Sequence, residues 1–201
     1  SKYFITRLMI KNRESVDALN PYNVGGRSNL ASDWECFDWN ESEFPPSNKV
    51  FDIMKNFYCY ERYPDICASQ LKQKLSEYVS LPLDFIEVYN GSDDGLKDIF
   101  TVFVDKGTKV LTYTPSYTQV DTFISINTDY YVKEQIVDPF GIHEYKWEKC
   151  IDKDVVYIVN PNNPTGKLID VSIIQRLLQE NPNTLFVVDE AYYEFARQSC
   201  A

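Results

Sequence analysis

Hydrophobic and polar positions follow two alternating patterns from about residue 65 to the end of the chain. Mostly apolar runs of roughly four to eight residues are typical of buried strands, whereas apolar residues that recur every three or four positions indicate amphipathic helices. The runs predict strands at 85–89, 109–114, 129–137, 154–159 and 184–188. The helical spacing predicts helices at 65–81, 92–104, 116–126 and 170–180. Strand and helix therefore alternate over most of the chain.

This alternation predicts an α/β protein, with a mainly parallel sheet and flanking helices. The runs at 154–159 and 184–188 are apolar at almost every position, which suits strands that are covered on both faces. Residues 1–60 are irregular and rich in turn formers. We therefore expect an N-terminal arm or wrapping segment over 1–60, followed by an α/β domain over 61–201.

Charge and composition exclude several classes of function. The 201 residues carry a formal net charge of −10, and an acidic surface repels the phosphate backbone of nucleic acids. No apolar run is long enough to span a bilayer, so we expect a cytoplasmic protein without membrane contact. The five cysteines are widely spaced and the only histidine is His143, so we expect reduced thiols and neither a disulfide framework nor a metal site.

The segment after the first predicted strand opens a helix with Asn90-Gly91-Ser92-Asp93-Asp94. In parallel α/β sheets, ligands gather at the carboxyl ends of the strands. A helix start with Gly and Ser offers free backbone N–H groups and the positive end of the helix dipole, which suits a phosphate. The alternative is a simple Asn-Gly turn with Ser92 as N-cap. Asp93 and Asp94 do not decide between the two, because acidic residues suit the first turn of a helix but also compete with a bound anion.

Two further strand ends carry unusual polar residues. The loop NPNNPTG follows the run at 154–159, and its prolines restrict the backbone. Two interpretations are open: a stiff corner that directs amide side chains, or a loop that is stiffened only for stability. Asp189 follows the run at 184–188, where a carboxylate is costly unless it is paired. Asp189 is therefore either held for a cationic partner or is a helix N-cap or satisfied surface acid. In the helix after the NPNNPTG loop, Asp170 is the expected N-cap.

The NPNNPTG loop at one strand end and DEAY at the next together resemble the fold-type I pyridoxal-phosphate aminotransferases, and more narrowly the histidinol-phosphate aminotransferase group. Further segments match that group in the same order along the chain, so the resemblance covers nearly all of it. These segments are LNPY (19–22), FDWNESEFPPS (37–47), RYPDICASQLKQKLSEYV (62–79), NGSDDGLKDIF (90–100) and YTPSYTQV (113–120).

The resemblance implies pyridoxal 5′-phosphate as cofactor and gives several residues a role around its ring. Asp189 would face the pyridine nitrogen and keep it protonated, so that the ring accepts electrons when the substrate loses a proton. Asn163 and Tyr192 would hydrogen-bond to the phenolic oxygen of the ring. Tyr117 would stack on the face of the ring.

Further residues would hold the cofactor phosphate and the substrate by the same resemblance. Gly91, Ser92 and Asp93 would bind the phosphate, Tyr63 would reach the partner's phosphate across a homodimer interface, and Tyr22 and Asn40 on the arm would contact the substrate. The group usually has Glu where this chain has Asp94. It also usually has a second Asn two residues after the one that matches Asn40, where this chain has Ser42. These departures leave the detailed substrate preference open.

The catalytic lysine of the family, which forms the Schiff base with the cofactor, lies a few tens of residues beyond the DEAY motif. The 12 residues after Asp189 contain no lysine, so the chain resembles the N-terminal half of such an enzyme and is expected to be inactive alone. The intact protein would transfer an amino group between an amino acid or amino-alcohol phosphate and a 2-oxo acid. Two alternatives are a decarboxylase of a phosphorylated amino acid on the same fold, and a truncated non-catalytic homologue that acts as a binding module.

Overall fold

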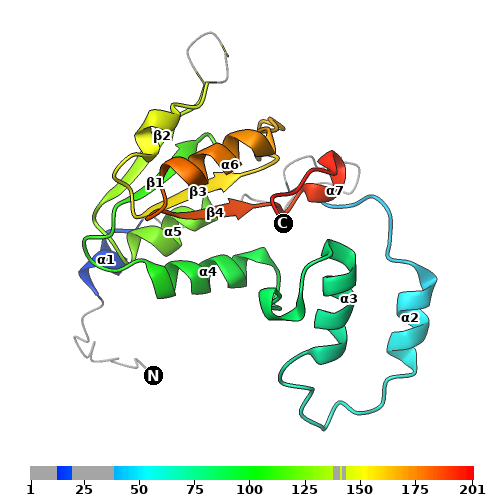
Figure 1. Ribbon diagram of the computed structural model, residues 1–201. Coiled ribbons are helices and arrows are strands. Elements are labelled where there is room, and N and C mark those ends of the chain that lie inside the picture. Colours follow the sequence, from blue (N-terminus) through cyan, green and yellow to red (C-terminus); the bar gives the residue numbers. More distant parts are fainter. Residues whose placement is uncertain (1–12, 20–38, 138–140, 142–143) are drawn as a thin grey trace, which may run out of the picture. The chain divides into compact units, whose positions relative to one another are not determined.

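The computed structural model describes residues 13–19, 39–137, 141 and 144–201 (Figure 1). The chain divides into two compact units. The first contains the described residues of Ser1–Pro21 and Glu87–Ala201, and the second contains those of Tyr22–Ile86. The boundary between arm and domain near residue 60 stays a prediction.

A four-stranded sheet forms the centre of the first unit, in the order β2-β1-β3-β4. Each neighbouring pair is parallel, which confirms the predicted α/β class and sheet type. Val159 lies opposite Asp189 in the register of β3 and β4, so these two strands end side by side. The strands are β1 (Val110–Thr114), β2 (Tyr131–Gln135), β3 (Val155–Val159) and β4 (Leu185–Asp189).

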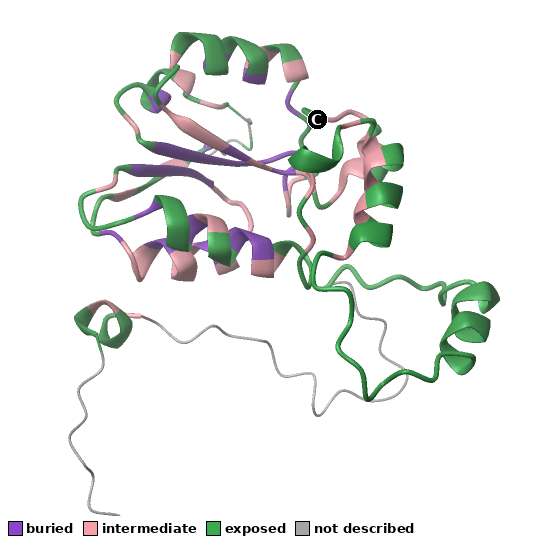
Figure 2. Ribbon diagram, turned by 60° about the horizontal axis from the view of Figure 1, so that its bottom comes forward, coloured by how far each residue is buried: buried purple, intermediate pink, exposed green. Residues whose placement is uncertain are grey.

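Helices cover both faces of this sheet. Residues of α4 (Ser92–Phe103) and α5 (Gln119–Ser125) pack on one face, where Phe100 and Ile124 are fully buried. Residues of α6 (Val171–Glu180) pack on the other face. Figure 2 shows the consequence, with the buried strands β1 and β3 at the centre and exposed outer sides on the helices. The unit also contains α1 (Glu14–Asp17), the 3₁₀ helix η3 (Trp147–Cys150) and α7 (Tyr193–Ala196).

Local sequence signals account for β3 and α6. All five residues of β3 are buried, as its continuous apolar run predicts. The predicted N-cap of α6 is confirmed, because the Asp170 carboxylate accepts a hydrogen bond from the Ser172 amide at 2.8 Å. Hydrogen bonds from Ser172 lower the pKa of the Asp170 carboxyl group.

The strand predicted at 85–89 is wrong. The 3₁₀ helix η2 (Leu83–Phe85) includes its first residue, and residues 86–89 are not paired with any described strand. Tyr89 instead packs on the first turn of α4, where a Cβ atom added to Gly95 would lie 3.2 Å from the Tyr89 ring. A strand exists only through hydrogen bonds to a neighbour, and this segment forms none with a described strand.

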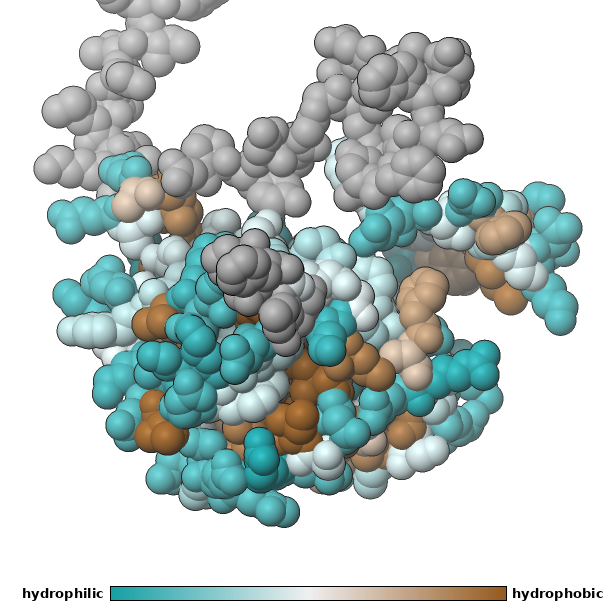
Figure 3. Space-filling model, turned by 90° about the horizontal axis from the view of Figure 1, so that it is seen from above, coloured by the Kyte–Doolittle hydropathy of each residue, from teal (hydrophilic) through white to brown (hydrophobic). Residues whose placement is uncertain are grey.

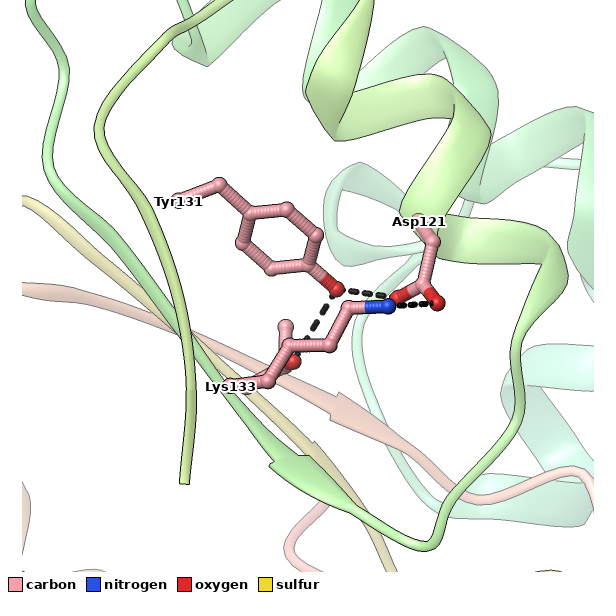
Figure 4. A network of polar contacts seen from close by, with 4 residues as sticks. Asp121, Tyr131 and Lys133 are labelled. Atoms are coloured by element: carbon pink, nitrogen blue, oxygen red, sulfur yellow. Dashed lines mark hydrogen bonds and ion pairs between the residues drawn. The ribbon is translucent and has the colours of Figure 1, made fainter. Parts of the chain in front are cut away.

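A polar network ties the edge strand β2 to α5 (Figure 4). The Asp121 carboxylate on α5 accepts hydrogen bonds from the Tyr131 hydroxyl and the Lys133 ammonium group on β2. Thr112 on β1 extends the network, since its hydroxyl lies 3.1 Å from that of Tyr131. Charged side chains of this kind protect an exposed sheet edge from pairing with other chains.

The second unit consists of two helices and η2 in the part that the structure describes. They are α2 (Asn48–Lys55) and α3 (Ser69–Val79), and α3 lies within the helix predicted at 65–81. The Asp65 carboxylate accepts hydrogen bonds from the amides of Cys67 and of Ser69, the first residue of α3. Neither α2 nor α3 contains a buried residue.

Hydrophilic residues predominate on the face shown in Figure 3, with smaller hydrophobic areas between them. None of the described helices is both long and apolar enough to cross a membrane. Within the same described residues, no three His, Cys, Asp or Glu side chains are grouped so that they could hold a metal ion. Cys59, Cys67, Cys150 and Cys200 are free thiols. Cys36 and His143 lie outside the described residues.

Candidate functional site

A pocket of about 140 Å³ lies in the first unit, where β3 and β4 end. Its lining comes from the start of α4, the segment after β1 and the residues at and beyond the ends of β3 and β4. Five predicted cofactor residues meet there, although they are far apart in the sequence. The lining residues are Ser92, Tyr117, Val159, Asn163, Asp189, Ala191 and Tyr192. The carboxyl edge of a parallel sheet is the expected place for such a pocket.

Asp189 is a buried carboxylate at the end of β4, with an exposed fraction of 8%. The Tyr157 hydroxyl donates a hydrogen bond to its Oδ2 atom at 2.7 Å, and the Ala191 amide donates to Oδ1 at 3.1 Å. These two donors compensate the cost of burying the charge. A carboxylate has about four lone-pair sites, so Asp189 can accept another hydrogen bond from a ligand in the pocket.

Two asparagines of the NPNNPTG loop hold its shape. The Asn160 side chain accepts a hydrogen bond from the Ile169 amide at 2.8 Å and donates to the Ile169 carbonyl oxygen at 3.1 Å. Asn162 accepts from the Ser116 hydroxyl at 2.7 Å and donates to the Pro115 carbonyl oxygen at 3.0 Å. The first pair closes the base of the loop, and the second joins it to the segment after β1.

Asn163 lines the pocket, unlike Asn160 and Asn162, which are buried and hydrogen-bonded to neighbouring segments. The sequence predicts a stiff corner that directs amide side chains. In the structure, two of the three amides hold the loop in shape and the third faces the pocket. No sequence signal marks Asn160 or Asn162 as the two that shape the loop. Tyr157 was missed for a similar reason, because it lies inside an apolar run.

The start of α4 faces the pocket through Ser92. The N-cap of α4 is Gly91, whose φ of +82° lies in the left-handed region that favours glycine, so the interpretation of Ser92 as N-cap is wrong. The Asp93 carboxylate accepts hydrogen bonds from the Tyr117 hydroxyl at 2.9 and 3.0 Å. The Asp94 carboxylate accepts one from the Asn90 amide at 3.4 Å. Both acids thus bond to other groups, and the amides of the first turn can bind an anion.

The residues of the pocket fit pyridoxal phosphate. A cavity of roughly 150 Å³ can hold a benzene molecule, so about 140 Å³ suits one six-membered ring. Asp189 can accept a hydrogen bond from a ring N–H, and Asn163 and Tyr192 add further polar groups to the lining. The amides at the start of α4 suit the phosphate. None of the described lining residues is basic, so the helix start is the positive element that the lining supplies.

Five predicted site residues are not part of this pocket lining. Two of them, Gly91 and Asp93, lie at the start of α4. Tyr63 belongs to the second unit and has an exposed fraction of 98%. Asn40 also belongs to the second unit, and its φ of 51° is in the left-handed region. Tyr22 lies outside the described residues.

The chain matches the family model described as Aminotransferase class I and II over residues 40–201. It is 35% identical to a dihydroxyacetone phosphate transaminase of Campylobacter jejuni over 81% of this chain and 46% of the relative. It is 31% identical to a histidinol-phosphate aminotransferase of Clostridium beijerinckii over 92% of this chain and 52% of the relative. The chain thus spans about half the length of the curated relatives that it matches.

Solved structures share the fold. The L-threonine-O-3-phosphate decarboxylase of Porphyromonas gingivalis superimposes with a TM-score of 0.61 and 26% identity, over 74% of this chain and 46% of that one. The histidinol-phosphate aminotransferase of Sinorhizobium meliloti, solved with pyridoxal-5′-phosphate, gives a TM-score of 0.65 at 23% identity, over 75% and 42% of the two chains.

Proposed function

Because the chain belongs to the class I and II aminotransferase family, we propose that its pocket binds pyridoxal 5′-phosphate and that the whole protein is a transaminase. The observation that carries the proposal is Asp189, a buried carboxylate that lines a pocket of about the size of one aromatic ring. Asp189 accepts two hydrogen bonds from neutral donors and keeps lone pairs that face the pocket, so a protonated pyridine nitrogen is a cationic partner that it can bind there.

Each lining residue has a role in this proposal. Asp189 accepts a hydrogen bond from the ring nitrogen and keeps it protonated. Asn163 and Tyr192 hydrogen-bond to the phenolic oxygen of the ring, and Tyr117 lies against its face. When bound, the cofactor supplies an electron sink for the bond that breaks at the substrate α-carbon. The residues of this chain bind and orient the ring.

The start of α4 holds the phosphate in this proposal. Gly91 provides the left-handed turn, and the backbone amides of Ser92 and Asp93 donate to the phosphate oxygens. The Asp93 carboxylate takes part indirectly, because it accepts hydrogen bonds from the Tyr117 hydroxyl. This bond links the residue beside the ring to the turn beside the phosphate.

The substrate class is a phosphorylated amino compound, with a 2-oxo acid as the acceptor of the amino group. The names of the two curated relatives both include a phosphorylated compound. Histidinol phosphate is the donor that we propose to assay first, and Tyr22 and Asn40 are its proposed contacts. The proposal includes a cytoplasmic location, in which the free thiols of the described cysteines remain reduced.

The proposed activity is tested with a form of the protein that carries the family's lysine. With histidinol phosphate and 2-oxoglutarate, we expect glutamate formation that depends on added pyridoxal 5′-phosphate. Histidinol without the phosphate is the matched control and should react much more slowly. The 201-residue chain alone should show no turnover. Absence of glutamate with every phosphorylated donor would contradict the transaminase.

A second candidate function is the decarboxylation of a phosphorylated amino acid. The observation that favours it is the similarity to the threonine-phosphate decarboxylase, with a TM-score of 0.61 and 26% identity. L-threonine O-3-phosphate distinguishes the two reactions in the same assay. Release of CO₂ without glutamate would identify a decarboxylase. A full-length form that binds the cofactor but catalyses neither reaction would be a non-catalytic binding module.

We further propose that the intact protein is a homodimer in which the Tyr63 hydroxyl reaches the partner's cofactor phosphate. The almost complete exposure of Tyr63 supports this role, since a tyrosine without a core position can contact another subunit. Tyr63→Phe should weaken cofactor binding by about 0.5–1.5 kcal/mol, the net worth of one hydrogen bond.

Mixed dimers test whether this site is shared between subunits. When Tyr63→Phe subunits are mixed with subunits that lack the lysine, one site per heterodimer contains both the tyrosine and the lysine. We expect that site to have normal cofactor affinity in a titration of activity. Mixed dimers that show only the weakened affinity, or full activity of a monomer at high dilution, would disprove the shared site.

A further inference from the structure

We propose that Tyr157 is a positioning residue, whose hydroxyl fixes the orientation in which the Asp189 carboxylate meets a ring nitrogen. The proposal rests on the proposed function of the pocket and extends it to a residue inside the sheet. Tyr157 does not line the pocket, so it would act through Asp189 and not through the ligand itself.

The register of the sheet places the two side chains on one face. Val159 lies opposite Asp189, and Tyr157 precedes Val159 by two residues, so all three point toward the same side. Tyr157 and Val159 belong to the buried cluster that α4 and α5 cover. A tyrosine side chain is long enough to reach from this position to the end of the neighbouring strand. Its hydroxyl meets Oδ2 of Asp189 at 2.7 Å.

Tyr157 is itself held in place. Its exposed fraction is 1%, and its ring packs edge-on against that of Phe100 on α4, with 5.9 Å between the ring centres. Burial, together with the negative charge of Asp189 and the hydrogen bond to it, raises the pKa of the Tyr157 hydroxyl well above its usual range. The group therefore stays protonated and acts as a donor throughout the pH range of an enzyme assay.

The two donors to Asp189 bond to different oxygen atoms of its carboxylate. Tyr157 bonds to Oδ2 and the Ala191 amide bonds to Oδ1, so rotation of the carboxylate would break both hydrogen bonds. The lone pairs that remain are the ones that a ligand can use. Without the Tyr157 hydroxyl, only the Ala191 amide restrains the carboxylate, and a ring N–H loses an oriented acceptor.

Ligand binding to the 201-residue chain tests this role. The two probes are pyridoxamine 5′-phosphate and its deaza analogue, in which a C–H group replaces the ring nitrogen; neither has an aldehyde that reacts with lysines. We expect Tyr157→Phe to raise the Kd of pyridoxamine 5′-phosphate by about tenfold and that of the analogue by less than about twofold. Calorimetric titration measures both values on the same protein sample. Partial unfolding would weaken the binding of both probes equally, so the ratio of their two Kd values does not depend on the stability of the variant.

Tyr113→Phe is the matched control. Tyr113 is a buried tyrosine on the neighbouring strand β1, but its hydroxyl contacts the Cys150 sulfur at 3.4 Å within the cluster on the other face of the sheet. This variant loses the same oxygen and should bind both probes as the wild type does. In the double variant Tyr157→Phe/Asp189→Asn, the tyrosine substitution should add no further loss to that of Asp189→Asn alone.

The outcomes separate this proposal from the function of the pocket. Equal weakening of both probes by Tyr157→Phe, or no weakening, would overturn the positioning role. The proposed function would still stand if Asp189→Asn weakened only the probe with the ring nitrogen. A wild-type chain that binds neither probe, or whose binding is unaffected by Asp189→Asn, would overturn the proposed function and this inference with it.

Discussion

Asp189→Asn should lower kcat at least about 100-fold in a form of the protein that carries the family's lysine. Asparagine has the shape of aspartate, and its amide oxygen can still accept a hydrogen bond from Tyr157 or the Ala191 amide. It lacks the negative charge that keeps the ring nitrogen protonated. The loss therefore falls on the transition state, and the affinity for the cofactor should decrease much less than kcat does.

Steady-state kinetics and a cofactor titration on the same variant measure the two effects. Asp170→Asn is the control, because it also removes one carboxylate from the first unit. Asp170 only caps α6, and asparagine is an equally good N-cap, so this variant should keep the wild-type kcat. A near-normal kcat in Asp189→Asn would show that Asp189 is a structural acid.

The sequence predicts elements best where the signal is local. The sequence of β3 is a continuous apolar run, which is typical of a strand that is covered on both faces. This strand forms as predicted. α6 combines helical spacing with the Asp170 cap, and both are found. The segment at 85–89 has the composition of a strand but has no described pairing partner. Pairing depends on residues distant in the chain, which composition does not specify.

Part of the candidate site could also be predicted, because topology determines where strand ends meet. Once the sheet is parallel, residues that follow its strands share one edge. Asn163 and Asp189 both follow strands, and both line the pocket. Tyr157 could not be predicted in the same way. Its hydrogen bond to Asp189 depends on the register of β3 and β4 and on the length of one side chain. An apolar run in the sequence gives no signal of either.

The three asparagines of the NPNNPTG loop show the same limit. They lie within four consecutive residues and have the same chemistry, yet Asn160 and Asn162 are buried while Asn163 is at the pocket. The distinction arises from which backbone groups need partners when the loop closes. That requirement is a property of the folded loop and of the segment after β1, and the order of residues does not reveal it.

Asn160→Ala should lower the free energy of unfolding by about 2–4 kcal/mol. The Asn160 side chain is completely buried and satisfies both the amide and the carbonyl group of Ile169. Alanine removes both partners, and each buried polar group left without one costs roughly 1–3 kcal/mol. The same change removes buried side-chain volume and leaves a small cavity, which adds to the loss. Urea denaturation of the 201-residue chain measures the effect as a shift of the midpoint.

Asn163→Ala is the matched control, since it truncates the same side chain three residues further along the same loop. Asn163 is partly exposed at the pocket, so we expect its truncation to change the free energy of unfolding by less than about 1 kcal/mol. Its effect should appear in cofactor binding, where Asn163 is proposed to bond to the ring oxygen. Equal shifts of the urea midpoint in the two variants would contradict the division between amides that shape the loop and the amide that faces the ligand.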